Sequence, residues 1–249
     1  MTSDFDKITL ILAAGKGKRM KSELPKVLHK LNGKYIVDYV IDSAREAGID
    51  KHILVIGHKA VQVREALNER DIVFAHQVEQ HGTGHAVMIA REHLRDFHGD
   101  LIVLCGDMPL VRPGTIRNLI EERQRLGASA VVLTVVLDDP AKYGRIVRDE
   151  KGLLKAIVEY RDADNETRKI KEVNTGAYCF DWNKLQKILD ELDDDNDQKE
   201  YYLTDSIDLF VRRGETVGAL IASDPNEGLG INSAEELAMV ERLIIEGTI

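Results

Sequence analysis

Small residues, glycines and cations gather directly after the first apolar run of the chain. Residues 8–13 form that run, and residues 13–20 read Ala-Ala-Gly-Lys-Gly-Lys-Arg-Met. Lys26 follows within Pro-Lys-Val-Leu at 25–28. Glycines let backbone N–H groups approach phosphate oxygens, and cations neutralise the phosphate charge. The pattern therefore predicts a phosphate site. A solvated basic turn is the alternative, because glycine-rich turns after strands are common.

This segment matches neither of two well-known phosphate motifs. A P-loop requires four residues between its first glycine and Gly-Lys-Ser/Thr, and a dinucleotide fingerprint requires a third glycine where this chain has Met20. The glycine pattern alone consequently leaves the nature of the phosphate ligand open.

Two oxygen-bearing side chains are placed where a hard cation could be held. Asp107 follows the apolar run 101–105, and Asn232 lies near the end of the chain. Mg²⁺ prefers a few carboxylate and amide oxygens together with phosphate oxygens. Taken singly, each residue has a simpler interpretation: an aspartate that closes a strand and an asparagine that caps a helix.

The elements that must position these residues alternate between strands and helices in the first half. Helical spacing of apolar residues and Gly48 as a stop signal define the first helix. Alternation of this kind predicts a mostly parallel sheet with helices on both faces. The expected strands are 8–13, 53–56, 72–75 and 101–105, and the expected helices are 36–44, 60–67, 84–94 and 113–127.

The second half of the chain does not continue the regular alternation of strands and helices. A turn-rich tetrad at 149–152 separates two strand-like runs, which predicts a β-hairpin of residues 145–147 and 153–158. Further expected elements are a strand 173–180, helices 182–192 and 203–212, and a strand 217–221. No Gly/Ser or Pro-rich linker interrupts them, so we expect one α/β domain over residues 1–232.

A last helix is expected over residues 233–249. Ser233 and Glu236 have the spacing of a capping box, and an apolar face follows at helical spacing. The members of that face are Leu237, Val240, Leu243 and Ile244.

Composition excludes several classes of protein. The 249 residues are 43% hydrophobic with a net charge of −9, which predicts a globular chain and disfavours a general DNA or RNA binder. No apolar stretch has the length of a membrane span and the start lacks a signal-peptide pattern, so we expect a cytoplasmic protein without membrane contact. Cys105 and Cys179 lie in apolar runs and are expected to be small buried thiols.

The ordered motifs of this chain resemble a known family. The segment 12–20 with Pro-Lys-Val-Leu at 25–28 resembles the signature of sugar-1-phosphate nucleotidylyltransferases. Later segments are similar, in order, to the pyrophosphorylase half of the bifunctional N-acetylglucosamine-1-phosphate uridylyltransferases/glucosamine-1-phosphate acetyltransferases. The resemblance extends from about residue 10 to Asn232, and its later segments are 77–86, 106–110, 143–146, 157–159, 173–176 and 200–205.

The resemblance implies a fold, a reaction and a cofactor. The fold would be the nucleotide-diphospho-sugar transferase fold: a Rossmann-like, doubly wound, mostly parallel mixed sheet with a β-hairpin insertion in the second half. The reaction would join UTP to N-acetylglucosamine 1-phosphate and release pyrophosphate, with Mg²⁺ on Asp107 and Asn232. Arg19 and Lys26 would be the catalytic cations, and the product, UDP-N-acetylglucosamine, would serve as a peptidoglycan precursor.

The resemblance also implies the substrate-binding residues. Gln77 would read the uracil edge, since a carboxamide can both donate and accept hydrogen bonds there. The sugar would be held by Gly144, Glu159 and Asn174. The nucleotide would be held by Leu12, Ala13, Ala14, Gly15, Lys26, Gln77, Gln80, Gly82 and Thr83.

His81 and His85 are spaced four residues apart in the same segment. They lack a third ligand nearby and the His-Glu-x-x-His order, so solvated or helix-capping histidines are favoured over a metal pair.

Three departures from the family pattern bear on function. Lys18 stands where the family more often has threonine, which adds a cation beside the phosphates, and Cys105 precedes Gly-Asp where bulkier or hydroxylated residues also occur. The bifunctional family continues into a left-handed β-helix of hexapeptide repeats that carries the acetyltransferase, and residues 1–249 contain no such repeats, so acetyl transfer is not assigned to them and a continuation of the natural protein stays open. Two alternatives stay open: a uridylyl or thymidylyl transferase for another sugar 1-phosphate, and a non-catalytic nucleotide-sugar-binding module.

Overall fold

The computed structural model describes residues 5–246, apart from the side chain of Lys18. Its main sheet has the strand order β11, β7, β10, β6, β1, β4, β5, and β8 and β9 form a hairpin beside β10. The strands are β1 Lys7–Ala13, β4 His52–Ile56, β5 Val73–His76, β6 Asp100–Cys105, β7 Ala130–Val136, β8 Arg145–Arg148, β9 Leu154–Val158, β10 Glu172–Asp181 and β11 Val217–Ile221.

Four of the six strand pairs along this seven-strand order run parallel. β1 pairs in parallel with both β4 and β6, β4 with β5, and β7 with β11, whereas β10 is antiparallel to β6 and β7. The predicted fold class, a mostly parallel mixed sheet with a hairpin in the second half, is confirmed. The parallel arrangement puts the ends of β1, β4, β5 and β6 at one edge, where α/β proteins bind ligands.

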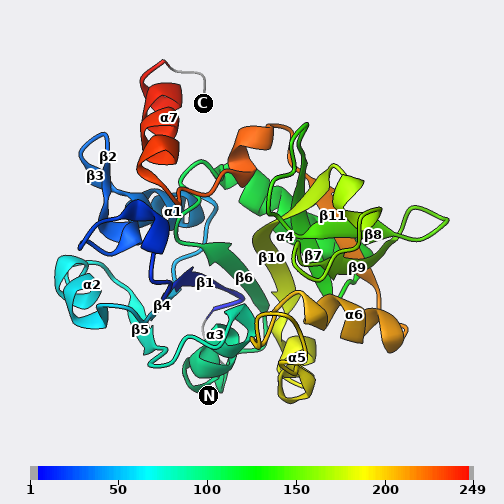
Figure 1. Cartoon of the computed structure of the whole chain (residues 1–249). Coiled ribbons are helices and arrows are strands. Elements are labelled where there is room, and N and C mark those ends of the chain that lie inside the picture. The colour runs from blue at the N-terminus through cyan, green and yellow to red at the C-terminus, as the bar shows by residue number, and fades with distance from the viewer. Residues whose placement is uncertain (1–4, 247–249) are drawn as a thin grey trace.

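Helices cover both faces of the sheet (Figure 1). One core cluster packs α3, α5 and α6 against the sheet, and the second packs α1, α2 and α4 against the other face. Along β1 the side chains alternate between the clusters, since Leu10 belongs to the first and Ile11 to the second. The helices are α1 Ile36–Glu46, α2 Ala60–Ala66, α3 Thr83–Ala90, α4 Pro113–Leu126, α5 Trp182–Leu185, α6 Asp205–Arg212 and α7 Ala234–Ile245.

Two helices end just before the glycines that were predicted to terminate them. Gly48 after α1 and Gly127 after α4 both have positive φ, 87° and 56°. Pro113 occupies the first turn of α4, where its missing N–H costs no hydrogen bond.

The predicted continuous helix over 182–192 is wrong. α5 ends at Leu185, and a 3₁₀ turn covers Leu189–Glu191. Trp182, Leu185 and Ile188 are fully buried and recur every third residue. A 3₁₀-helix has three residues per turn, so side chains spaced three residues apart lie on one face of it. These three side chains can therefore stay in the core although the α-helix ends at Leu185.

Three strands were not among those expected: β7 in the main sheet and two short strands outside it. β2 Lys30–Leu31 and β3 Lys34–Tyr35 form an antiparallel hairpin whose turn holds Asn32 and Gly33 at positive φ. α7 lies beside this hairpin in Figure 1.

α7 has the predicted capping box and the predicted apolar face. The Ser233 hydroxyl accepts from the Glu236 backbone N–H, and Glu236 accepts in return from the Ser233 N–H. Val240 is buried in a third cluster, with Leu237, Leu243 and Ile244 packed against it. Residues 247–249 of the expected helix lie outside the described residues, and the division of the chain after residue 232 stays a prediction.

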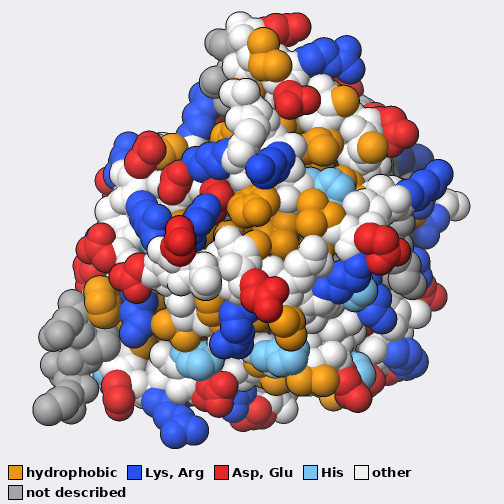
Figure 2. Space-filling model, turned by 90° about the vertical axis from the view of Figure 1, so that its left-hand side faces the viewer, with side chains coloured by type: hydrophobic (Ala, Val, Ile, Leu, Met, Phe, Trp, Pro, Cys, Tyr) orange, Lys and Arg blue, Asp and Glu red, His pale blue; other side chains and the backbone are white. Residues whose placement is uncertain are grey.

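One face of the molecule, the left-hand side of Figure 1, carries hydrophobic side chains at its centre with both signs of charge interspersed around them (Figure 2). Among the described residues, no helix is long and apolar enough to cross a membrane.

Candidate active site

The loop after β1 is shaped by a glycine that Lys26 packs against. Gly17 has φ of 57°, and a Cβ built on it would lie 3.0 Å from the Lys26 Cβ. The Gly17 carbonyl accepts from the Met20 N–H at 2.9 Å and closes a 3₁₀ turn. The glycine therefore supplies both the left-handed backbone and the space that bring the Lys26 segment against the loop.

Lys26, Asp107 and Asn232 come together although they are distant in sequence. The Lys26 Nζ donates to Asp107 Oδ2 in a short ion pair and to Asn232 Oδ1 at 3.0 Å. The Ile231 N–H donates to the Asp107 carbonyl at 2.9 Å, which ties the segment after β6 to the segment before α7. The ion pair is largely shielded from solvent, with the two side chains 16% and 17% exposed.

These residues fit the Mg²⁺ that the family resemblance implies. A carboxylate oxygen and an amide oxygen already converge on one cation, the Lys26 ammonium, and both are ligand types that Mg²⁺ prefers. Asp107 and Asn232 would hold the metal, and Lys26 would then be free to turn toward a substrate phosphate.

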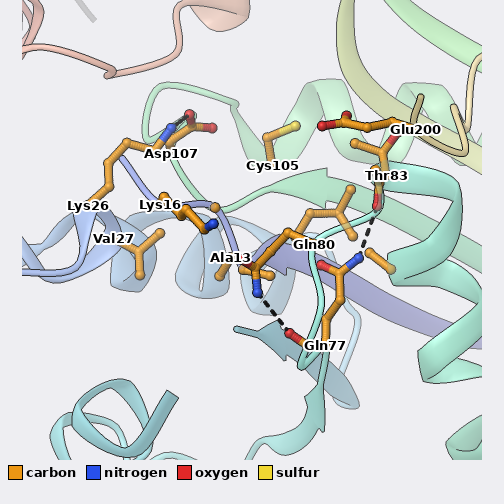
Figure 3. Close-up of a pocket in the computed structure, with 15 residues that line it drawn as sticks. Ala13, Lys16, Lys26, Val27, Gln77, Gln80, Thr83, Cys105, Asp107 and Glu200 are labelled. Carbon is orange, nitrogen blue, oxygen red and sulfur yellow. Dashed lines mark hydrogen bonds and ion pairs between the residues drawn. The ribbon is translucent and has the colours of Figure 1, made fainter. Parts of the chain in front are cut away.

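A cavity of about 510 Å³ opens at the ends of β1, β5 and β6. All nine residues expected to hold the nucleotide line it, and Figure 3 shows Lys26, Gln77, Gln80 and Thr83 arranged around it. Six lining residues were not among the expected ligands of the nucleotide: Lys16, Val27, Ala86, Cys105, Asp107 and Glu200.

A clamp of backbone hydrogen bonds holds one wall of this cavity. The Gly84 N–H donates to the Tyr201 carbonyl and the Tyr201 N–H donates to the His81 carbonyl, both at 2.8 Å. The Thr83 hydroxyl accepts from the Leu203 N–H at 3.0 Å. Gly82 has φ of 101°, and a Cβ there would lie 2.5 Å from the Tyr201 carbonyl oxygen, so only glycine fits.

The Gln77 side chain is buried and fixed. It is 3% exposed, and its Nε2 lies 3.0 Å from the Gly82 carbonyl oxygen and 3.0 Å from His85 Nδ1. Its backbone N–H donates to the Ile56 carbonyl of β4 at 2.8 Å. The Nε2 end of the carboxamide thus contacts the protein itself, and Oε1 is the end that a base could meet.

A second cavity, of about 220 Å³, adjoins the first. It is lined by the three residues expected to hold the sugar: Gly144, Glu159 and Asn174. Leu12, Thr83 and Cys105 line both cavities, so the two spaces meet at these side chains.

The Glu159 carboxylate faces this second cavity over Gly144. A Cβ at Gly144 would lie 3.4 Å from both carboxylate oxygens, so the glycine leaves that carboxylate uncovered. Burial raises the pKa of Glu159, and a hydrogen bond from the Thr204 hydroxyl opposes that rise.

Asn174 is more engaged within its own strand than the sequence suggested. Its Nδ2 donates to the Tyr178 hydroxyl at 2.7 Å, and its Oδ1 accepts from the Gly176 N–H at 2.9 Å. These bonds span the irregularity between Asn174 and Tyr178 where β10 changes register against β7. The residue lines the cavity while it also shapes the bulge.

Arg19 lies apart from the nucleotide cavity. Its exposed side chain lines a groove with Lys142, Glu159 and Gln198, on the side of the second cavity. The side chain of Lys18, expected beside the phosphates, lies outside the described part of the structure.

The cysteines differ from each other. Cys179 is fully buried as predicted. Cys105 is only partly buried, because it lies at the end of β6 where the two cavities meet, and its thiol donates to the Gly176 carbonyl of β10. Burial nevertheless raises the pKa of its thiol to about 12, so the thiol stays protonated.

Glu200 is a lining residue that the sequence signalled only indirectly. It belongs to the 200–205 run of the family pattern, and no spacing rule connects that run to the β1 loop. The clamp of Tyr201 on the 81–84 segment brings it to the cavity.

Comparison with known proteins places the chain in a family. Residues 9–173 match the model of the MobA-like NTP transferase domain. The chain belongs to this family. The matched residues include the loop after β1 and the carboxyl ends of β1, β4, β5 and β6.

Curated relatives extend the similarity almost to the end of the chain. The sequence is 46% identical over 237 residues to a protein of Acetivibrio thermocellus called "Bifunctional protein GlmU", covering 95% of this chain and 51% of that protein. A protein of the same name from Clostridioides difficile is 44% identical over 235 residues, covering 94% and 51%. The chain thus spans about half the length of these relatives. The predicted resemblance to the bifunctional family is confirmed.

Solved structures confirm the fold. A UDP-glucose pyrophosphorylase in complex with UDP-glucose superposes with a TM-score of 0.78 at 18% identity, covering 98% of this chain and 100% of that one. A putative glucose-1-phosphate thymidylyltransferase from Bacillus anthracis gives a TM-score of 0.77 at 19% identity, covering 95% and 94%.

Proposed function

We propose that this MobA-like domain transfers UMP from UTP to N-acetylglucosamine 1-phosphate and releases pyrophosphate. The observation that carries the proposal is the junction of the two cavities at Leu12, Thr83 and Cys105. A nucleotide in the first cavity and a sugar phosphate in the second would meet there. The high identity to the proteins called "Bifunctional protein GlmU" supports the choice of this reaction among those of the family.

The reaction needs no covalent enzyme intermediate. A phosphate oxygen of the sugar phosphate forms a bond to the α-phosphorus of UTP, and the bond from that phosphorus to the bridging oxygen breaks as pyrophosphate leaves. The nucleophile is already ionised, so no proton has to be removed. The protein must bring two anions together in line and stabilise the charge that develops.

The cations of the site perform that stabilisation. Lys26 lies at the wall of the nucleotide cavity and would contact the phosphates, and Lys16 lines the same cavity. Arg19 approaches from the side of the second cavity, where it would contact the phosphate of the sugar. This local cluster allows a protein of net charge −9 to bind two polyanions.

Asp107 and Asn232 would hold Mg²⁺. When bound, the metal supplies positive charge that neutralises phosphate oxygens. The ion pair with Asp107 holds Lys26 at the edge of the nucleotide cavity before the metal binds, and Lys26 would then turn toward the phosphates.

Binding residues select the two substrates. Gln77 offers Oε1 to the N3–H of uracil, and the uncovered Glu159 carboxylate over Gly144 would accept from sugar hydroxyls. Gly82 would act through the wall of the cavity, because the Cβ that it lacks would collide with the Tyr201 carbonyl.

The experiment that tests the proposal measures pyrophosphate release with UTP, CTP, ATP, GTP and dTTP against a panel of sugar phosphates. We expect the highest kcat/KM with UTP and N-acetylglucosamine 1-phosphate. A higher value with glucose 1-phosphate would assign the domain to another sugar. Nucleotide-sugar binding without any pyrophosphate release would identify a non-catalytic binding module instead.

A further inference from the structure

The Gln77 carboxamide has a hydrogen-bond partner that the proposed reaction does not use. His85, in the first turns of α3, lies with its Nδ1 3.0 Å from Gln77 Nε2. The second amide hydrogen is directed to the Gly82 carbonyl at 3.0 Å. An amide nitrogen has two hydrogens and no acceptor lone pair, so both contacts require acceptors.

The tautomer of His85 suits this contact. Burial is the largest influence and lowers the pKa of His85, and the nearby His81 lowers it further. The lowered pKa favours the neutral ring, in which one nitrogen donates and the other accepts. Because the Gln77 Nε2 can only donate, the 3.0 Å contact requires Nδ1 to be the acceptor.

The orientation of the carboxamide decides what a base encounters. Figure 3 shows the Gln77 nitrogen directed to the segment at Thr83 and the oxygen on the other side of the group. The oxygen accepts from the N3–H of uracil. Cytosine has an acceptor at N3, so the same oxygen would oppose it.

We propose that His85 is a positioning residue for base selection: its Nδ1 accepts from Gln77 Nε2 and thereby holds Gln77 Oε1 toward uracil. The inference rests on the proposed use of UTP. A ring that donated at Nδ1 would repel the amide hydrogen, and a flipped carboxamide would then place its nitrogen toward the base.

The groups around His85 define its titration. Glu79 and His81 face it from the segment before α3, and the His81 ring centre lies 5.3 Å away. From the segment before α6, the Tyr201 ring lies 6.3 Å away and Glu200 packs against Gly82. The pKa of His85 is therefore below the ordinary histidine value of about 6.5, and the ring gains its proton only at a lower pH.

The test compares kcat/KM for UTP and for CTP in the parent, His85→Phe, His85→Gln and Gln77→Ala. At about pH 8, His85→Phe removes the acceptor, and we expect the UTP/CTP ratio to fall about tenfold, the usual effect of one hydrogen bond. His85→Gln, which can again accept, should recover part of the ratio. The KM for the sugar phosphate should not change.

Two further measurements separate positioning from a general loss of structure. In the double variant Gln77→Ala/His85→Phe the loss should not exceed that of Gln77→Ala alone, because His85 acts through Gln77. His81→Phe is the matched control, since His81 pairs with Glu79 and not with Gln77, and its ratio should equal that of the parent at pH 8.

A pH profile supplies the third measurement. As the pH is lowered from about 8 to below the ordinary histidine pKa of about 6.5, the UTP/CTP ratio of the parent should fall once His85 gains a proton, whereas that of His85→Phe should stay flat. A ratio within twofold of the parent in His85→Phe at pH 8 overturns the proposal while the proposed function stands.

If no sugar phosphate supports turnover, the proposed function fails. The same variants are then compared by calorimetric binding of UTP and CTP. Equal affinity of the parent for the two nucleotides, or an unchanged affinity ratio in His85→Phe, would overturn the assignment of His85 there.

Discussion

The Lys26 ammonium donates to the Asn232 side-chain oxygen at 3.0 Å, although 206 positions separate the two residues. The contact joins the loop after β1 to the segment that precedes α7, and Asp107 completes the cluster from the end of β6. A carboxylate, an amide oxygen and a cation thus share one point at the edge of the sheet. The predictions below test what this point and its surroundings do.

Asp107→Asn is expected to keep the fold and lose at least a hundredfold in turnover. The substitution removes a charged ligand for Mg²⁺ and the ion-pair partner of Lys26, and electrostatic groups of this kind are typically worth about 10²- to 10³-fold. Turnover should recover in part at high Mg²⁺ or Mn²⁺. Asp138→Asn, at an exposed surface ion pair, is the control and should behave like the parent. Parent-like turnover of Asp107→Asn at limiting Mg²⁺ would refute the metal assignment.

Lys26→Ala should reduce kcat/KM by about 10²- to 10³-fold, because it removes a cation from the wall of the nucleotide cavity. Lys171→Ala is the matched control: this exposed lysine pairs with Asp138 away from both cavities, and its loss should leave kcat/KM unchanged. Steady-state pyrophosphate release measures both. A Lys26→Ala enzyme within a few-fold of the parent would show that the lysine only completes an ion pair.

Arg19→Ala should fall in the same range, with its effect concentrated on the sugar phosphate. Arg19 lines the groove beside Glu159 and not the nucleotide cavity, so the KM for N-acetylglucosamine 1-phosphate should rise more than the KM for UTP. Initial rates with each substrate varied in turn separate the two constants. An unaltered kcat/KM would assign Arg19 to a solvated loop.

Gly144→Ala should raise the KM for the sugar phosphate about tenfold and leave the KM for UTP unchanged. The new Cβ would lie 3.4 Å from both carboxylate oxygens of Glu159 and would cover the acceptor that the sugar needs. Gly114→Ala in α4 is the control, because its nearest neighbour would be 3.9 Å away. An unchanged KM for the sugar phosphate in Gly144→Ala would mean that Glu159 does not face the sugar.

The stability of the fold should decrease in acid through His52. This residue is 1% exposed, neither ring nitrogen has a hydrogen-bond partner among the described residues, and burial lowers its pKa to about 4. Its pKa in the unfolded chain is about 6.5, so the unfolded state binds more protons between the two values. The contribution of neutral His52 is fully present above about pH 6.5 and is lost progressively as the pH falls from about 6.5 to about 4.

Urea unfolding of the parent and of His52→Leu measures this effect. Linkage predicts that the free energy of unfolding of the parent drops by about 2 kcal/mol more than that of His52→Leu between pH 8 and pH 5. The variant is the internal reference for all other titrating groups. Parallel curves for the two proteins would contradict the assignment to His52.

Local signals in the sequence determined much of this protein. Glycines at Gly48 and Gly127 stop helices because positive φ favours them, and the Ser233 and Glu236 pair caps α7 because both partners lie within one turn. The conformations of the glycine-containing loop after β1 and of the turn at residues 149–152 likewise depend mainly on neighbouring residues. The family resemblance named a set of nucleotide and sugar ligands, and these line the two adjoining cavities.

Tertiary structure alone decided how those residues meet. An apolar run has the same composition whether its strand is parallel or antiparallel, so the sequence did not reveal that β10 runs against β6 and β7. Nothing in the spacing of Gln77 and His85 shows that they share a hydrogen bond, and nothing local joins Lys26 to Asn232. Side-chain pairing depends on which elements become neighbours when the core packs, and that is a property of the whole chain.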